Sequence, residues 1–162
     1  MTNFVTTSDQ LDVFDHRILS LVQNNSDATH SEIGALVGLS GSAVRRRLKR
    51  MKGLGVIQKS IAVLDPDQFG VTVIVELNFK NETPQIYEDF DRQMLLTPEV
   101  QQSYYVAGSS DYMLVVHAPT LQRYEEWAKS ALMSNENIER YNTRVVWSRK
   151  KFGPFIKFPE RE

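Results

Sequence analysis

A run of positive charge is the first feature of this sequence whose residue types and spacing could do chemistry. Seven cations lie between residues 45 and 59, and no Asp or Glu occurs from Ile33 to Leu64. They are Arg45, Arg46, Arg47, Lys49, Arg50, Lys52 and Lys59. A solvated helix face usually carries both signs of charge, whereas a patch of one sign is the footprint of a protein that binds a polyanion. The run therefore predicts contact with nucleic acid.

The charges of the whole chain are unevenly distributed around this run. All 162 residues together carry a formal net charge of −1 at pH 7. Up to Leu64, eight basic residues stand against five acidic ones, a balance of +3, and the remainder has a balance of −4. The asymmetry predicts a basic first domain and an acidic second domain.

Composition and missing motifs exclude several other functions. The chain has 41% hydrophobic and 24% charged residues, as soluble globular proteins do. It has no cysteine, which excludes disulfides, thiolate metal sites and cysteine nucleophiles. His16, His30 and His117 share no metal-ligand spacing, and no nucleophile elbow, P-loop or dinucleotide-binding pattern occurs. We expect no catalytic residues, no metal and no cofactor.

The sequence predicts neither a membrane span nor a secretory signal. No stretch approaches the about 18 consecutive apolar residues of a membrane span. Residues 1–9 have neither a basic start nor a long apolar run, so no secretory signal is predicted. We expect a cytoplasmic protein that has no membrane partner and associates with the nucleoid when it is bound to DNA.

Three acidic residues near the N-terminus, Asp9, Asp12 and Asp15, follow one another at a spacing of three. Such a spacing could indicate a cation site. The simpler interpretation is a set of helix N-terminal carboxylates that interact favourably with the helix dipole.

The elements that must position the cations are predicted to be short helices. Thr29 and Glu32 have the spacing of a capping box at the start of one helix, which Gly38 ends. Ser40 can cap the next helix, which runs from Gly41 to about Lys52 and contains most of the cations. Two short helices joined by a tight turn are a helix-turn-helix. The following segment, 56–64, is predicted to form a small hairpin, or wing.

Helical periodicity divides the second of these helices into two faces. Val44, Leu48 and Met51 define a buried stripe, and Arg47 lies beside it, where we expect an ion pair or a snorkelling role. The opposite face would enter the major groove. Ser42, Arg45 and Arg46 are candidates for base contacts, and Lys49, Arg50 and Lys59 for phosphate contacts. The complete predicted DNA-binding set is Ser40, Ser42, Arg45, Arg46, Lys49, Arg50 and Lys59.

The second half of the chain alternates strands and helices. Their order is strand-helix-strand-strand-helix-strand, the ferredoxin-like βαββαβ arrangement. The chain is therefore predicted to be α+β, with a winged helix-turn-helix at 1–64, a linker at about 65–70 and an αβ sandwich at 71–162. The apolar segment Phe152–Phe158 is predicted as a short edge strand that packs on a partner subunit.

Motifs from both halves resemble those of one family. In the first half these are Leu11-Asp12-x-x-Asp15-x-x-Ile18-Leu19, Glu32-Ile33, Val37-Gly38-Leu39-Ser40, Val44-x-Arg46-Arg47 and Gly55-Val56-Ile57. In the second half, Val106–Tyr112 is similar to a G-x-x-D-Y effector loop. The chain resembles the Lrp/AsnC, or feast/famine, transcriptional regulators from Leu11 to about Val146.

The resemblance implies further properties. It implies a RAM-type ligand-binding and oligomerisation domain, a homodimer that in many members forms tetramers or octamers, and an amino-acid or related effector at a subunit interface. The effector residues carried over by position are Gly108, Ser109, Ser110, Asp111, Tyr112 and Thr143. Ser109 and Ser110 stand where members commonly have an acidic and an aromatic residue, which favours a smaller or more polar ligand.

Two classes of function remain open at this point. One is a DNA-binding regulator, oligomeric and responsive to an amino acid or related small molecule. The alternative is a carrier or enzyme built on the αβ domain, with the basic domain as an accessory. An enzyme requires converging acid, base or nucleophile residues in the second half. We find none there, so the sequence favours the regulator.

Overall fold

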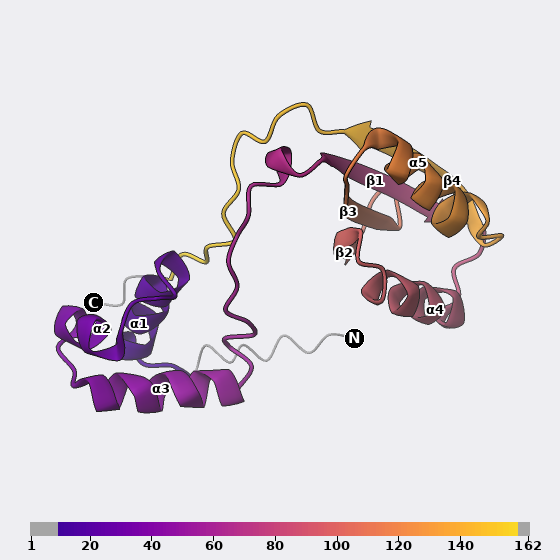
Figure 1. Cartoon of the computed structure of the whole chain (residues 1–162). Coiled ribbons are helices and arrows are strands. Elements are labelled where there is room, and N and C mark those ends of the chain that lie inside the picture. The colour runs from indigo at the N-terminus through magenta and orange to yellow at the C-terminus, as the bar shows by residue number, and fades with distance from the viewer. Residues whose placement is uncertain (1–9, 159–162) are drawn as a thin grey trace. The chain divides into compact units, whose positions relative to one another are not determined.

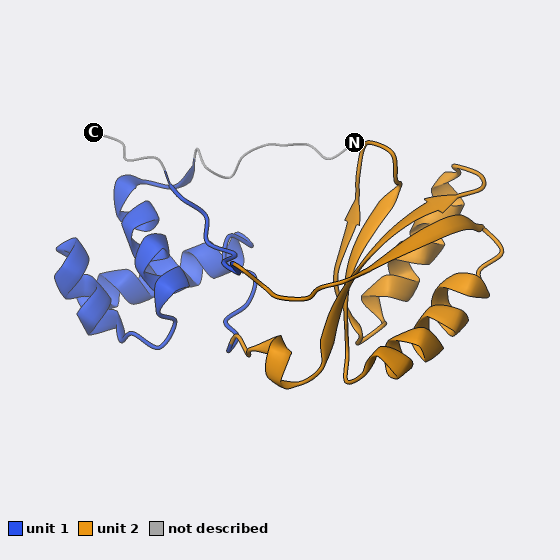
Figure 2. Cartoon of the chain, turned by 90° about the horizontal axis from the view of Figure 1, so that it is seen from above, with its two compact units in different colours: residues 1–62, 151–162 blue, residues 63–150 orange. Residues whose placement is uncertain are grey.

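The computed structural model describes residues 10–158, which divide into two compact units. Residues 10–62 together with 151–158 form the first unit, and residues 63–150 form the second (Figure 2). The sequence suggests boundaries near 64 and 71, with the whole C-terminal segment in the second domain. The structure instead places the described part of that segment, 151–158, with the first unit.

Three helices form most of the first unit (Figure 1): α1 (Val13–Asn24), α2 (His30–Val37) and α3 (Gly41–Gly53). The predicted capping box at the start of α2 is confirmed. The Thr29 hydroxyl accepts the Glu32 N–H at 3.2 Å, and the Glu32 carboxylate accepts the Thr29 N–H at 2.7 Å. This pairing satisfies two amides that have no partner inside the helix.

The turn between α2 and α3 depends on two glycines. Gly38 ends α2 with φ +74°, the left-handed conformation predicted for it. The Ser40 hydroxyl then starts α3 by accepting the Ala43 N–H at 3.2 Å. A Cβ on Gly34 would lie 2.4 Å from the Leu39 carbonyl oxygen, so only glycine allows the chain to fold back this closely. The two helices form the predicted helix-turn-helix.

Apolar side chains from all three helices meet in one core. The buried members are Leu11, Ile18, Leu19, Ile33, Val37, Val44, Leu48 and Met51. Helix α3 contributes Val44, Leu48 and Met51, which is the stripe predicted from its periodicity. The orientation of α3 about its own axis therefore follows the prediction.

The predicted wing is absent from the described structure. Residues 56–64 form no strand, and Ile61, Val63 and Leu64 are exposed. A tight hairpin needs a turn residue that tolerates positive φ, and Gln58-Lys59-Ser60 offers neither Gly nor Asn there. A lone two-stranded hairpin is also only marginally stable in water.

The C-terminal segment 151–158 packs on α1 and forms no strand. The Gln23 side-chain amide bonds both backbone groups of Ile156: its Oε1 accepts the N–H at 3.0 Å and its Nε2 donates to the carbonyl at 2.9 Å. Phe158 stacks on the buried His16 ring, with 5.1 Å between centroids. The prediction of an edge strand is therefore wrong, since the backbone of Ile156 pairs with a side chain and not with a strand.

The second unit is a four-stranded sheet with two helices. Its elements are β1 (Val71–Phe79), α4 (Pro84–Leu95), β2 (Val100–Tyr105), β3 (Tyr112–Ala118), α5 (Leu121–Ala128) and β4 (Ile138–Val145). A 3-10 turn, η2 (Pro66–Gln68), precedes β1, and a π turn, η3 (Lys129–Met133), continues α5. The strand order is β2-β3-β1-β4 and every neighbouring pair is antiparallel. This is the predicted ferredoxin-like topology.

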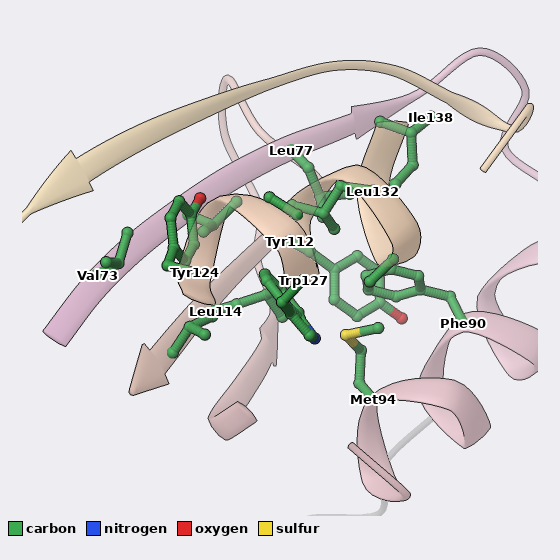
Figure 3. Packing of buried hydrophobic residues seen from close by; sticks show 14 of the residues in the cluster. Val73, Leu77, Phe90, Met94, Tyr112, Leu114, Tyr124, Trp127, Leu132 and Ile138 are labelled. Atoms are coloured by element: carbon green, nitrogen blue, oxygen red, sulfur yellow. The ribbon is translucent and has the colours of Figure 1, made fainter. Parts of the chain in front are cut away.

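The two helices cover one face of this sheet (Figure 2). Burial alternates along β1 and β3, so that Val73, Val75 and Leu77 face the helices together with Leu114 and Val116. Figure 3 shows Phe90 and Met94 of α4 meeting Tyr112, while Tyr124, Trp127 and Leu132 come from the other helical segment. Strand β1 pairs with β3 on one side and with β4 on the other, and its buried side chains belong to this core. In residues 10–158, no helix is long and apolar enough to cross a membrane.

Candidate functional site

Helix α3 presents its cations in two different ways. Arg45, Arg46, Lys49 and Lys52 are exposed, and none of them forms an ion pair with a described residue. Ser42, on the same side, is exposed, and its hydroxyl lies 3.0 Å from that of Ser40. This surface carries positive charge with no acidic partner among residues 10–158.

The remaining two arginines of α3 turn toward the start of α1. Arg47 donates from Nη1 to Asp12 Oδ2 at 2.6 Å and to Asp15 Oδ1 at 2.9 Å. Its guanidinium also lies 5.6 Å from the centre of the Phe14 ring. Arg50 pairs with the second oxygen of Asp15, and its Nη1 bonds the Gln10 carbonyl at 3.3 Å. The ion pair expected for Arg47 is confirmed, whereas the pairing of Arg50 was not foreseen.

The first turn of α1 therefore has a structural role. Asp12 and Asp15 form a capping box, since each carboxylate accepts the other residue's backbone N–H. Asp15 is fully buried, and Asp12 is half-exposed. This supports the helix-terminal interpretation of these acids, while Asp9 lies outside the described residues. No three His, Asp or Glu side chains in residues 10–158 are grouped so that they could hold a metal.

These contacts raise the pKa of Arg47 and lower the pKa of Asp12, so both shifts favour the charged forms. Hydrogen bonds from Arg47 to Asp12 and Asp15 raise the pKa of its guanidinium, against the effect of burial. Partial burial favours the neutral form of Asp12, but the Asp15 amide and the Arg47 guanidinium together hold the pKa of Asp12 below its usual value. Both groups are therefore charged throughout the neutral range.

The loop between β2 and β3 contains the candidate effector residues. Asp111 Oδ2 accepts the Phe79 N–H at 2.7 Å, and its own N–H bonds the Leu77 carbonyl at 3.0 Å. Asn78 donates to the Ser109 carbonyl at 3.0 Å. Gly108 has φ +145°, which non-glycine residues rarely adopt. The end of β1 therefore fixes the loop, and the exposed Ser109 lies at its tip.

Thr143 lies away from this loop within one chain. Thr143 is on β4 and pairs with Val75 of β1, whereas Tyr112 is on β3 and pairs with Leu77 of β1 from the opposite side. Two strand spacings and two residues separate Thr143 and Tyr112 by about 12 Å. The Thr143 hydroxyl instead lies 2.6 Å from that of Tyr124.

A tyrosine cluster supports the loop from the helical side. Tyr112 is buried and donates to Asp91 of α4 at 2.7 Å. Its ring centre lies 5.5 Å from that of Tyr105, which lies 5.2 Å from that of Tyr87. Burial, with Glu82 nearby, raises the pKa of Tyr87 to about 12, so the Tyr87 phenol remains neutral at physiological pH. Sequence reasoning missed Asp91 and Tyr87, because their partners on the loop are distant in the sequence.

Known families match the same two regions. Residues 11–52 match the AsnC-type helix-turn-helix domain, and residues 72–154 match the Lrp/AsnC ligand binding domain. The chain belongs to the Lrp/AsnC family of transcriptional regulators. It is thus a DNA-binding regulator, and the relatives of this family are named as regulators, not as enzymes.

Relatives from several bacteria resemble this Lrp/AsnC regulator over most of its length. An uncharacterised HTH-type regulator of Sinorhizobium fredii is 37% identical over 88% of this chain and 85% of its own. The leucine-responsive regulatory protein of Escherichia coli is 27% identical over 87% of both chains. The glutamate uptake regulatory protein of Zymomonas mobilis is 29% identical over 93% of both.

Solved structures share the fold. An AsnC-family regulator from Agrobacterium tumefaciens superposes with a TM-score of 0.83 at 27% identity, covering 91% of this chain and 97% of its own. A transcriptional regulator from Neisseria meningitidis, solved in complex with L-Met, has a TM-score of 0.82 at 24% identity, over 91% and 96% of the two chains.

Replacing Arg47 by Ala should lower the thermal stability of the protein more than replacing Arg45 does. The Arg47 variant leaves the buried Asp15 with one cation in place of two, and we expect a loss of about 1–3 kcal/mol. Arg45 is exposed without an ion pair among the described residues, so its loss should cost little. Calorimetric melting of both variants measures the difference, and equal melting temperatures would contradict the structural role of Arg47.

Proposed function

We propose that the exposed face of α3 reads DNA in the major groove. Ser42, Arg45 and Arg46 lie in the N-terminal half of the helix, which reaches base edges in helix-turn-helix proteins. An Arg fork matches the O6 and N7 acceptors of guanine. Lys49, Lys59 and the helix start at Ser40 are proposed to contact phosphates, which position the protein without specifying a sequence.

One observation supports this proposal most strongly: only some of the cations of α3 have an acidic partner. Arg47 and Arg50 are engaged with Asp15, whereas Arg45, Arg46 and Lys49 have no counter-charge among the described residues. Unpaired cations on one helix face repel one another, and a polyanion relieves that repulsion. The same surface releases counterions when it meets DNA. Binding to DNA would also place the protein in the cytoplasm, at the nucleoid.

We propose that the protein acts as a homodimer joined through the open face of the sheet. This face is opposite the helices and carries the paired residues Ile74 and Val115, with Met113 beside them. Glu76 and Arg144, which form an ion pair at 3.2 Å, stand beside this apolar centre. A face with an apolar centre and both charges at its edge can pair with its own copy about a two-fold axis.

We propose that the Gly108–Asp111 loop binds an amino acid or a related small zwitterion. Backbone amides of a turn can hold a carboxylate, and an aspartate can accept from an ammonium group. Asp111 uses Oδ2 for the Phe79 amide, and no described residue donates to its Oδ1. The names of the leucine-responsive and glutamate uptake relatives, and the L-Met complex of the Neisseria meningitidis protein, favour this ligand class. The exposed Ser109 favours a small or polar side chain.

Arg46→Ala should lower discrimination between a selected operator and random DNA while the fold remains intact. Losing a bidentate base contact costs about 1–3 kcal/mol at that position. Lys59→Ala should instead weaken binding to all sequences and lower the salt slope by about one. Fluorescence anisotropy at several salt concentrations measures both, on a duplex selected from a random pool and on a random duplex. If Arg46→Ala remains as selective as the wild type, the proposed orientation of α3 is wrong.

Light scattering at micromolar concentration should give at least twice the chain mass of 18.6 kDa. Val115→Asp should reduce this to the mass of the monomer, because a charge in the centre of a dry interface has no partner. Leu95→Asp, the same change at an exposed position of the helical layer, is the control and should leave the dimer intact. A monomeric wild type would refute the dimer, and a dimeric Val115→Asp would refute this interface.

Calorimetric titration of the twenty amino acids should identify at least one that binds and changes DNA affinity. Asp111→Asn keeps an acceptor for the Phe79 amide but loses the charge, so we expect at least about tenfold weaker binding of that amino acid. Its DNA affinity without ligand should equal that of the wild type, because Asp111 is not among the proposed DNA contacts. The ligand should then change DNA affinity less than in the wild type, since an effector acts only through differential affinity for two states. No heat from any amino acid, with no change in DNA affinity, would leave the loop as a structural turn.

A further inference from the structure

Asp15 is a fully buried charge that the proposed DNA contacts do not use. Its carboxylate is 0% exposed, although it belongs to the first turn of α1. Burial of a charge is costly unless each oxygen finds a strong donor. Here Oδ1 accepts from Arg47, and Oδ2 accepts from Arg50 and from the Asp12 amide. The carboxylate therefore binds two side chains of α3 at once.

The two arginines are three residues apart, so one carboxylate holds two points on successive turns of α3. The apolar contacts of Val44, Leu48 and Met51 keep α3 against the core, but such contacts have no directional preference. Charge-assisted hydrogen bonds to a guanidinium are directional. Together with the bond from Arg47 to Asp12, they restrict rotation and sliding of α3 relative to α1.

We propose that Asp15 is a positioning residue for DNA reading, and that its partner Arg50 is not a phosphate ligand. Asp15 sets the rotation of α3 that points Ser42 and Arg46 at the bases, and it neutralises Arg50 at contact distance. This inference rests on the proposed DNA contacts of α3. It reverses the expectation from the sequence, in which Arg50 and Lys49 have the same role.

The first test compares Arg50→Ala with Lys49→Ala in the full-length protein. The probes are a random-sequence duplex and a duplex of equal length that the wild type selects from a random pool. Lys49→Ala should lower the salt slope on random DNA by about one, because a phosphate contact is lost. Arg50→Ala should leave that slope unchanged but lower the ratio of selected to random affinity by about tenfold or more.

The conservative variant Arg50→Lys separates positioning from simple loss of charge. Lysine keeps the charge and one donor for Asp15, so it should recover part of the selectivity that Arg50→Ala loses. If Arg50→Ala lowers the salt slope as much as Lys49→Ala, or keeps the full selectivity, the inference is overturned. If Lys49→Ala leaves the slope unchanged, the proposed function fails, and the inference that depends on it fails too.

The second test removes the charge of Asp15 and keeps its shape. Asp15→Asn should lower selectivity by about tenfold or more, while affinity for random DNA stays equal or rises because Arg50 becomes available to phosphates. Asp27→Asn, the same change at an exposed position of the first unit, should alter neither quantity. Equal losses on both duplexes, as unfolding produces, or unchanged selectivity in folded Asp15→Asn would overturn the inference.

Discussion

The geometry of the first unit depends on one buried carboxylate with two arginine partners. Removing one arginine leaves the buried carboxylate with part of its desolvation cost uncompensated, about 1–3 kcal/mol while the second arginine remains. Exposed pairs such as Arg92 with Asp89 contribute only about 0–1 kcal/mol. Asp15 therefore constrains α3 more strongly than any surface ion pair could. Because Asp15 pairs with Arg47 and Arg50, the cations of α3 without an ion pair among the described residues include Arg45, Arg46 and Lys49.

The second unit is held together by a different kind of interaction. Its core is almost entirely apolar, and β1 is one of its two inner strands, paired along its length with β3 and β4. Directional contacts hold the loop to the end of β1, where Asp111 accepts the Phe79 amide and Asn78 donates to the Ser109 carbonyl. A rigid strand end thus supports an exposed loop. Such a combination suits a binding loop, because the scaffold bears the cost of ordering it.

Local signals in the sequence were sufficient for much of this fold. The capping box of Thr29 and Glu32, the left-handed Gly38 and the buried stripe of α3 each depend on residues within one or two turns. The ferredoxin-like order follows from the alternation of strands and helices. These features could be predicted because the physical cause lies within a short segment.

What the sequence did not predict depends on contacts between distant residues. Arg50 is separated from Asp15 by 35 residues, and Gln23 from Ile156 by 133, so no local pattern connects them. Angular position on α3 separated Arg47 from its neighbours, but it could not show that one carboxylate accepts from Arg50 as well. The wing was predicted from loose alternation alone, without a turn residue to support it.

A structure of the protein bound to its selected duplex measures directly whether Asp15 positions α3 on DNA. We expect α3 in the major groove, Arg46 within hydrogen-bond distance of base edges, and both Arg47 and Arg50 still bonded to Asp15. Another element in the groove would contradict this arrangement. So would Arg50 on a phosphate with Asp15 left without it.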